Sequence, residues 1–184
     1  MDLTDLTRGL GSRSEQARRD ALVRIWGMAQ VPDPLKPILV KVFSDGKFDE
    51  QLYVIIACNP CEEFSGPYMD MLTRPNVEWQ AYALKSLDRW IELGPPSFKE
   101  ALKKAVMDLI ASSNAWIRFL SARALASFLA GGDKAWDLAV DAVIAADLAS
   151  PAGGIRSEIF DTLEVDEIGH LNRHLKARGE EEID

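Results

Sequence analysis

The stretch NVEWQAYALKSLDRW, residues 76–90, decides the predicted fold, because it returns in altered form as NAWIRFLSARALASF at residues 114–128. Both stretches space their apolar residues by three and four, the pattern of an amphipathic helix. A shift of 38 residues aligns Asn76 with Asn114, and Asn is a favoured residue at the start of a helix. The two stretches are therefore predicted to be equivalent helices of successive repeats.

A short motif marks this second helix of each repeat: a small residue, then leucine, then a large apolar residue three positions after the leucine. The motif occurs with Leu22 and Ile25, with Leu87 and Trp90, and with Leu125 and Phe128. A fourth copy keeps Leu163 but has Asp166 at the large position. This departure suits a terminal repeat, which has no further neighbour to pack against.

The spacing of these motifs predicts about five helical hairpins with a period near 38 residues. The first interval, of 65 residues, leaves room for one more pair, formed by PLKPILVKVF (34–43) and FDEQLYVIIA (48–57). One hairpin cannot bury its apolar face alone, so such repeats stack on one another. The predicted fold is therefore all-α: a short α-α superhelix, or solenoid, followed by a C-terminal helix at 165–178.

These repeats resemble the HEAT and HEAT-like proteins, which are α-helical repeat proteins of the armadillo-type solenoid class. The resemblance covers roughly residues 2–165 and lies in the two-helix units and in the Ala/Ser-Leu core of the second helix. The pairs Ile117-Arg118 and Ile155-Arg156 give an Ile-Arg version of the family's Val-Arg pair. The resemblance implies a solenoid that binds other macromolecules, and it implies no particular partner.

Composition excludes several classes of protein. The 184 residues are 47% apolar and 27% charged, the balance of a soluble globular protein. No apolar run approaches the roughly 20 residues that a membrane-spanning helix needs, and the acidic, polar N-terminus is not a signal peptide. Two cysteines are too few for a secreted disulfide framework. A cytoplasmic location is therefore predicted.

The formal charge of −8 is concentrated at the C-terminal end, where residues 158–184 carry nine acidic and three strongly basic residues. The predicted organisation is a single domain over residues 1–178 and an acidic tail over residues 179–184. Nucleic-acid binders are typically basic, so direct binding of nucleic acid is not expected. A solvated tail and a basic protein partner both fit this charge.

Cys58 and Cys61 stand in a C-x-x-C spacing after an apolar run, as in thioredoxin-type redox motifs. Pro60 suits the first position of a helix, and the helix dipole would stabilise a thiolate at Cys61. Glu62 and Glu63 follow directly, and their carboxylates oppose a thiolate. The alternative is that both cysteines are small structural residues at a helix junction.

Other chemistry finds little support. His170 and His174 share a helical face and could join the cysteines in a zinc site. However, 108 residues separate the two pairs, several repeats apart in a solenoid, so no metal site is predicted. The sequence has no nucleophile-elbow, metalloprotease, P-loop or dinucleotide-binding motif. We therefore expect neither a cofactor nor an enzyme activity.

Tryptophan and arginine are favoured anchors of protein interfaces, and several of these residues, with one lysine, recur near the second helix of successive repeats. The candidates for partner binding are Trp79, Lys85, Arg89, Trp116, Arg118, Arg123 and Arg156. The alternative is that Trp79, aligned with Ile117, is part of the core and that Arg123 is a solvated charge.

The predicted function is non-enzymatic binding of a protein partner through one face of the helical repeats. One alternative is an inhibitor or immunity-type protein whose acidic end covers a basic enzyme such as a nuclease. A second alternative is a thiol-redox protein that uses Cys58 and Cys61.

Overall fold

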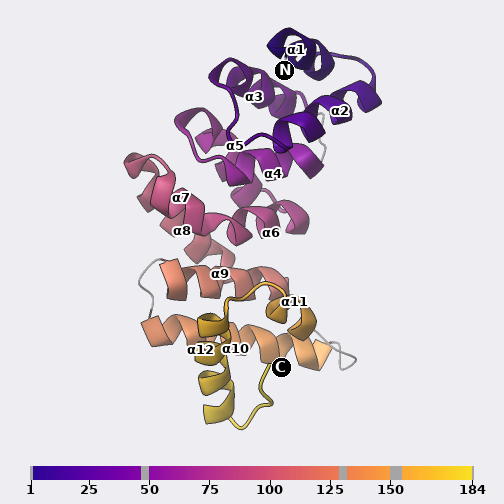
Figure 1. The fold of residues 1–184 in the computed structure, drawn as a ribbon. Coiled ribbons are helices and arrows are strands. Elements are labelled where there is room, and N and C mark those ends of the chain that lie inside the picture. The colour runs from indigo at the N-terminus through magenta and orange to yellow at the C-terminus, as the bar shows by residue number, and fades with distance from the viewer. Residues whose placement is uncertain (1, 47–49, 129–131, 150–154, 184) are drawn as a thin grey trace. The chain divides into compact units, whose positions relative to one another are not determined.

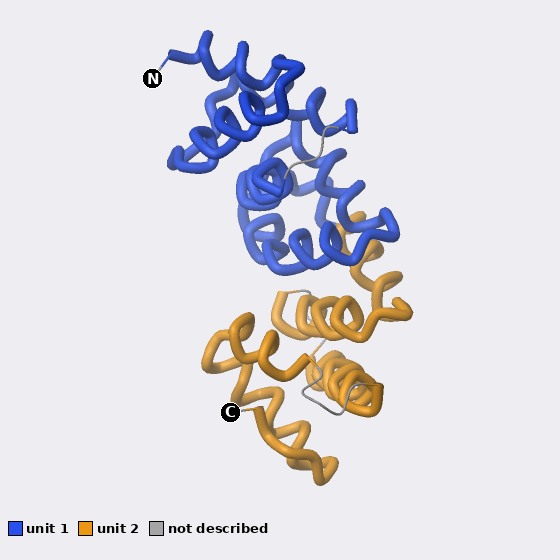
Figure 2. The backbone as a smooth tube through the Cα atoms, turned by 90° about the vertical axis from the view of Figure 1, so that its right-hand side faces the viewer, with its two compact units in different colours: residues 1–99 blue, residues 100–184 orange. Residues whose placement is uncertain are grey.

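The structure is a computed structural model that describes residues 2–46, 50–128, 132–149 and 155–183. Twelve α-helices and three 3-10 turns lie in these ranges, and none of the described residues is in a β-strand (Figure 1). The prediction of an all-α protein is confirmed. The chain divides into two compact units, residues 1–99 and residues 100–184 (Figure 2), a division that the repeat pattern does not predict.

The first unit contains seven α-helices. These are α1 (Leu3–Leu10), α2 (Glu15–Trp26), α3 (Lys36–Ser44), α4 (Glu50–Cys58), α5 (Ser65–Thr73), α6 (Val77–Lys85) and α7 (Leu87–Leu93). Three 3-10 turns, η1 (Asp33–Leu35), η2 (Glu62–Phe64) and η3 (Pro96–Phe98), lead into α3, α5 and α8. Alternate helices pack side by side: α1, α3 and α5 form one row, and α2, α4 and α6 form the other.

The second unit holds the remaining helices, α8 (Lys99–Leu109), α9 (Ala115–Phe128), α10 (Gly132–Ala149), α11 (Arg156–Phe160) and α12 (Val165–Ala177). Helix α9 packs along α10, and α10 also packs against α12. All four motif leucines, Leu22, Leu87, Leu125 and Leu163, are buried. None of the helices in the described part of the chain combines the length and the apolar character needed to cross a membrane.

Side chains of the turns start the helices. Asn76 Oδ1 accepts the Trp79 amide at 3.0 Å and Asn114 Oδ1 accepts the Ile117 amide at 3.1 Å, as predicted for N-caps. Helix α2 is capped by the side chain of Ser14.

An arginine holds the turn before the second helix in both units. Arg118 Nη1 donates to the carbonyl oxygens of Ser112 at 2.8 Å and Ser113 at 3.1 Å. Arg18 Nη1 makes the same pair of bonds five and six residues upstream, to Arg13 and Ser12. The two turns are thus held in the same way, because in each of them one arginine supplies a partner for two main-chain acceptors.

The predicted continuous helix at 76–90 is broken at Ser86, which separates α6 from α7. In an unbroken helix the Ala83 carbonyl would accept the amide of Leu87. Instead it accepts the Tyr68 hydroxyl at 2.5 Å and the Ser86 hydroxyl at 3.1 Å. Tyr68 comes from α5, so a tertiary contact and the local bond of Ser86 meet at the same carbonyl where the helix breaks.

Trp90 closes the core of the first unit beside this break. Its indole Nε1 donates to the Ala57 carbonyl at 2.9 Å, in the last turn of α4. Its ring stacks on Tyr68 with centroids 4.1 Å apart and meets Phe98 at 5.4 Å. Trp90 and Tyr68 are both fully buried. The last carbonyls of a helix have no partner within the helix, and here a buried side chain supplies one.

Residues 179–183 do not project as a separate acidic tail. They lie against the second unit, where Ile183 is buried at 4% exposure and its main chain bonds to the side chain of Asn172 in α12. Burial of this branched apolar side chain removes apolar surface from water and, together with the bonds to Asn172, holds the segment in place. Asp184 lies outside the described residues.

The Tyr68→Phe substitution is expected to destabilise the protein by about 1 to 2 kcal/mol. It removes the hydroxyl that bonds to the buried Ala83 carbonyl and leaves the aromatic packing in place. Urea denaturation followed by far-UV circular dichroism measures the change. Tyr82→Phe is the control, since its hydroxyl binds the exposed end of Glu50. A loss for Tyr68→Phe no larger than that of the control would contradict the role given to this bond.

Candidate functional site

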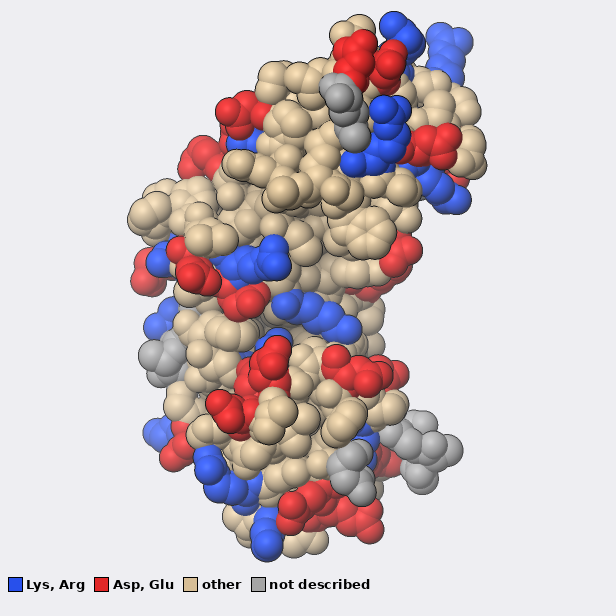
Figure 3. Space-filling view, in the orientation of Figure 1, with Lys and Arg blue, Asp and Glu red and all other residues tan. Residues whose placement is uncertain are grey.

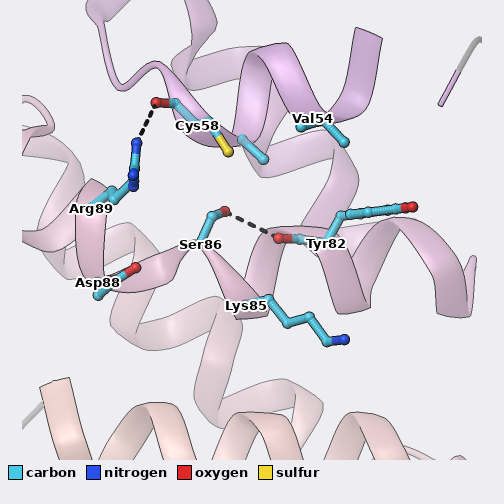
Figure 4. A pocket seen from close by; sticks show the side chains of 8 residues that line it. Val54, Cys58, Tyr82, Lys85, Ser86, Asp88 and Arg89 are labelled. Atoms are coloured by element: carbon cyan, nitrogen blue, oxygen red, sulfur yellow. Dashed lines mark hydrogen bonds between the residues drawn. The ribbon is translucent and has the colours of Figure 1, made fainter. Parts of the chain in front are cut away.

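Two adjoining hollows lie along the row formed by α2, α4 and α6 in the first unit. The first, of about 190 Å³, is lined by Trp26, Glu50, Gln51 and Val54. The second, of about 250 Å³, is lined by Val54, Ala57, Cys58, Tyr82, Lys85, Ser86, Asp88 and Arg89 (Figure 4). Val54 borders both hollows, so they form one continuous surface, called here the α2–α4–α6 face.

Trp26 is the most prominent apolar side chain of this face. It is the last residue of α2 and is 57% exposed, and Val23, one turn earlier, is 46% exposed. Leu22 and Ile25 of the same helix are buried. The helical period places Trp26 about 100° from Ile25, so the ring is turned from the core toward the first hollow.

Tyr82, which lines the second hollow, is hydrogen-bonded to Glu50, which lines the first. Its hydroxyl donates to Glu50 Oε1, which links α6 to the first turn of α4. This hydrogen bond to a carboxylate, with burial adding to it, raises the pKa of Tyr82 to about 12. The phenol therefore stays protonated and keeps donating at neutral pH. In the view of Figure 3 few charged side chains lie over the middle of α4.

The far end of the face is built on the C-terminal end of α4. Arg89 Nη1 donates to the Cys58 carbonyl at 3.4 Å, and Asn59 Nδ2 donates to the Ile55 carbonyl at 2.8 Å. The C-terminal end of a helix carries partial negative charge, so the guanidinium of Arg89 is well placed there. Figure 4 shows Arg89 reaching toward Cys58 while Lys85 extends away from it.

The structure separates the roles of the two cysteines. Both are half-buried free thiols. Cys58 lines the second hollow, whereas Cys61 is the N-cap of η2. Burial raises the pKa of Cys58, and burial together with a hydrogen bond involving Glu63 raises the pKa of Cys61. Both thiols are thus held protonated. A protonated thiol is a poorer nucleophile than a thiolate, so neither cysteine is activated for redox chemistry.

The first unit brings two of the predicted binding residues together and buries a third. Lys85 and Arg89, one helical turn apart in sequence, are exposed and line the second hollow. Trp79 is only 7% exposed, with ring centroids 4.7 Å from Tyr53 and 5.9 Å from Phe43. Trp79 is therefore part of the core, which agrees with its alignment with Ile117.

The predicted residues of the second unit mostly hold the fold. Arg118 binds the turn carbonyls described above. Trp116 is half-buried and stacks on Phe119, with centroids 5.5 Å apart. Arg156 pairs with Asp147 at 2.9 Å and donates to the Glu181 carbonyl at 2.8 Å. A partner-binding role for Trp116, Arg118 and Arg156 stays a prediction. A partner that binds them would have to leave the contacts described here intact.

Arg123 is buried at 8% exposure and is not a solvated charge. Its Nε and Nη2 donate to both carboxylate oxygens of Glu167 at 2.9 and 2.8 Å, which ties α9 to α12. Ser127 Oγ donates to the same carboxylate at 2.6 Å. Burial alone would raise the pKa of Glu167, but the hydrogen bonds from Arg123 and Ser127 outweigh it, so the pKa is lowered.

The cysteines and histidines lie in different units, and each histidine has its own contacts. His174 Nδ1 lies 3.0 Å from Asp137, and His170 stacks on Trp136 with centroids 6.0 Å apart. Within the described residues no group of three or more His, Cys, Asp or Glu side chains is arranged to hold a metal ion.

The chain matches no protein-family model, no curated protein and no solved structure.

Among the residues of the face that sequence reasoning missed are Trp26, Val54 and Tyr82. Trp26 had a detectable signal, since it falls outside the stripe of Leu22 and Ile25. Val54 had none, because every residue of its run LYVIIA is compatible with burial and only packing leaves Val54 half-exposed.

We expect both cysteines to react with iodoacetamide at pH 7.5 at least a few-fold more slowly than free cysteine, because only the thiolate attacks and burial disfavours it. Mass spectrometry of each modified peptide over time measures the two rates. The urea-unfolded chain is the control and should react at the rate of free cysteine. Faster reaction of either folded thiol would count against this account and in favour of redox chemistry.

Glu167→Gln is expected to destabilise the protein by about 2 kcal/mol at pH 7. The pKa of Glu167 is lowered on folding, so its stabilising effect is complete well above the ordinary glutamate pKa of 4.5 and is lost as pH falls through the lowered pKa of the folded state. The difference between wild type and variant should therefore shrink below pH 4.5 in urea titrations. Asp166→Asn, at the neighbouring exposed acid, serves as control. A difference that does not depend on pH would contradict the assignment.

Proposed function

We propose that this chain is a non-enzymatic protein-binding module and that the α2–α4–α6 face of the first unit is its binding face. One observation carries the proposal: two adjoining hollows share Val54, and the exposed Trp26 side chain lines the first of them. Clustered exposed apolar surface beside concave sites is typical of protein-interaction surfaces.

We further propose that the helix pairs stack as a short HEAT-like solenoid. The two rows of alternate helices in the first unit support this, as does the arginine-held turn that recurs in both units. In such repeats one helix from each pair contributes to a continuous surface. The α2–α4–α6 row is a surface of this kind.

The face has an apolar end and a basic end. Covering the exposed part of the Trp26 ring, on the order of 100 Å², would contribute about 2 to 3 kcal/mol to binding. At the other end Lys85, Asp88 and Arg89 line the second hollow, and the Arg89 side chain is exposed there. A protein segment with an apolar anchor and a nearby acidic residue would match both ends.

The two alternatives have weaker support. An inhibitor of a basic enzyme is favoured by the charge of the second unit, whose nine Lys and Arg stand against fifteen Asp and Glu. A thiol-redox function has the C-x-x-C spacing in its favour, and the raised pKa values of both thiols oppose it.

The binding face is tested with Trp26→Ala and Arg89→Ala in the full chain. A partner is first captured from the protein's own cell extract, and its Kd for each purified variant is then measured by calorimetry. Trp26→Ala should weaken binding at least tenfold, and Arg89→Ala should weaken it less, because central aromatic anchors dominate interfaces.

Leu93→Ala is the matched control: Leu93 is 65% exposed in the same unit and lines neither hollow. Its Kd should stay within twofold of wild type. Binding that survives Trp26→Ala, or that is lost equally in the control, would argue against the α2–α4–α6 face.

A further inference from the structure

The C-terminal segment of the second unit is held as an extended peptide in a groove beside α11 and α12. Helix α12 ends at a left-handed glycine, Gly179, with φ +74°. The Glu180 amide donates to the Leu175 carbonyl at 3.0 Å and the Gly179 amide to the Lys176 carbonyl at 3.1 Å. This pair of bonds is a Schellman motif, and it turns the chain back along the helix it has just left.

Asn172 binds the main chain of this segment at two points. The Ile183 amide donates to Asn172 Oδ1 at 2.7 Å, and Asn172 Nδ2 donates to the Ile183 carbonyl at 3.0 Å. A primary amide carries both a donor and an acceptor, so it pairs with one residue as a neighbouring β-strand would. Such a clamp recognises the backbone of an extended chain whatever its side chains are.

Two further contacts complete the recognition. Arg156 Nη1 donates to the Glu181 carbonyl at 2.8 Å, two residues before the clamp. Residues i and i+2 of an extended chain present the same side, so Arg156 and Asn172 read successive positions of one edge. Arg156 is itself held by Asp147 at 2.9 Å, and it is therefore pre-positioned for this bond.

The groove also has a side-chain preference. Ile183 is 4% exposed, so the site encloses a branched aliphatic residue. Lys176 Nζ lies 3.7 Å from Glu182, which favours an acidic residue just before it. A hollow of about 720 Å³ remains beside Glu180 and Glu181, lined on α10 by Ile144, Asp147 and Leu148, so the segment does not fill the space available.

We propose that this groove is a peptide-binding site for an extended acidic segment in which a branched aliphatic residue follows the acidic ones. Residues 181–183 occupy it within the same chain, and a partner's segment of the same chemistry competes with them. The site lies in the second unit and does not depend on the face proposed in the first. The tethered segment competes at an effective concentration of roughly 1 mM, so the groove opens only to a ligand in excess or to one that binds more tightly.

The test uses a dye-labelled peptide, acetyl-Glu-Glu-Glu-Ile-amide, and the full-length chain. Ile183→Gly weakens the internal competitor, so this variant should bind the peptide at least tenfold more tightly than wild type in a fluorescence-anisotropy titration. Adding Asn172→Ala to Ile183→Gly should reduce the affinity at least tenfold, because the main-chain clamp is lost. A peptide with glycine in place of isoleucine is the matched ligand control and should bind at least tenfold more weakly, because it keeps the main-chain bonds and loses the buried side chain.

A second measurement decides the matter even if Ile183→Gly fails to fold. Hydrogen exchange of the Ile183 amide is followed in the wild-type chain with and without about 10 mM peptide, above the effective concentration of the tether. Displacement should accelerate this exchange at least fivefold while the amides of α9 stay unchanged. Unchanged exchange at Ile183, or peptide binding that does not require Asn172, would overturn the proposal.

Discussion

The hydrogen bond from the Trp90 indole to the Ala57 carbonyl is the contact on which the first unit depends. It gives the last turn of α4 a partner, and it places α7 beside that turn. The same ring stacks on Tyr68, and the Tyr68 hydroxyl occupies the Ala83 carbonyl. The helix breaks at Ser86, and the break brings Arg89 and Asp88 to the rim of the second hollow.

In the second unit, charged side chains connect the helices to one another. Arg123 and Glu167 tie α9 to α12, and Arg156 ties α10 and α11 to the segment after α12. A charge taken out of water is costly unless a partner compensates it, and each of these arginines has two acceptors or more. Residues that look like surface anchors in the sequence are therefore committed to holding helices and turns together.

The two candidate binding regions differ in what they could recognise. The α2–α4–α6 face offers a large exposed ring and the exposed side chain of Arg89, which suits side-chain recognition of a protein segment. The groove beside α12 reads main-chain amides and carbonyls through Asn172 and Arg156, which suits an extended peptide. Neither region requires a reactive group, and this is consistent with the raised pKa values of Cys58 and Cys61.

The sequence by itself determined the helical content, the positions of most helices, the N-caps at Asn76 and Asn114 and the burial of the motif leucines. These features depend on spacing within a few residues, and that spacing is visible in one chain. Tertiary structure alone decided the half-exposure of Val54, the burial of Arg123 and the docking of Ile183. Each of these depends on a partner supplied from elsewhere in the fold. The contacts of a side chain depend on which residues surround it after folding, and its residue type alone does not identify those neighbours.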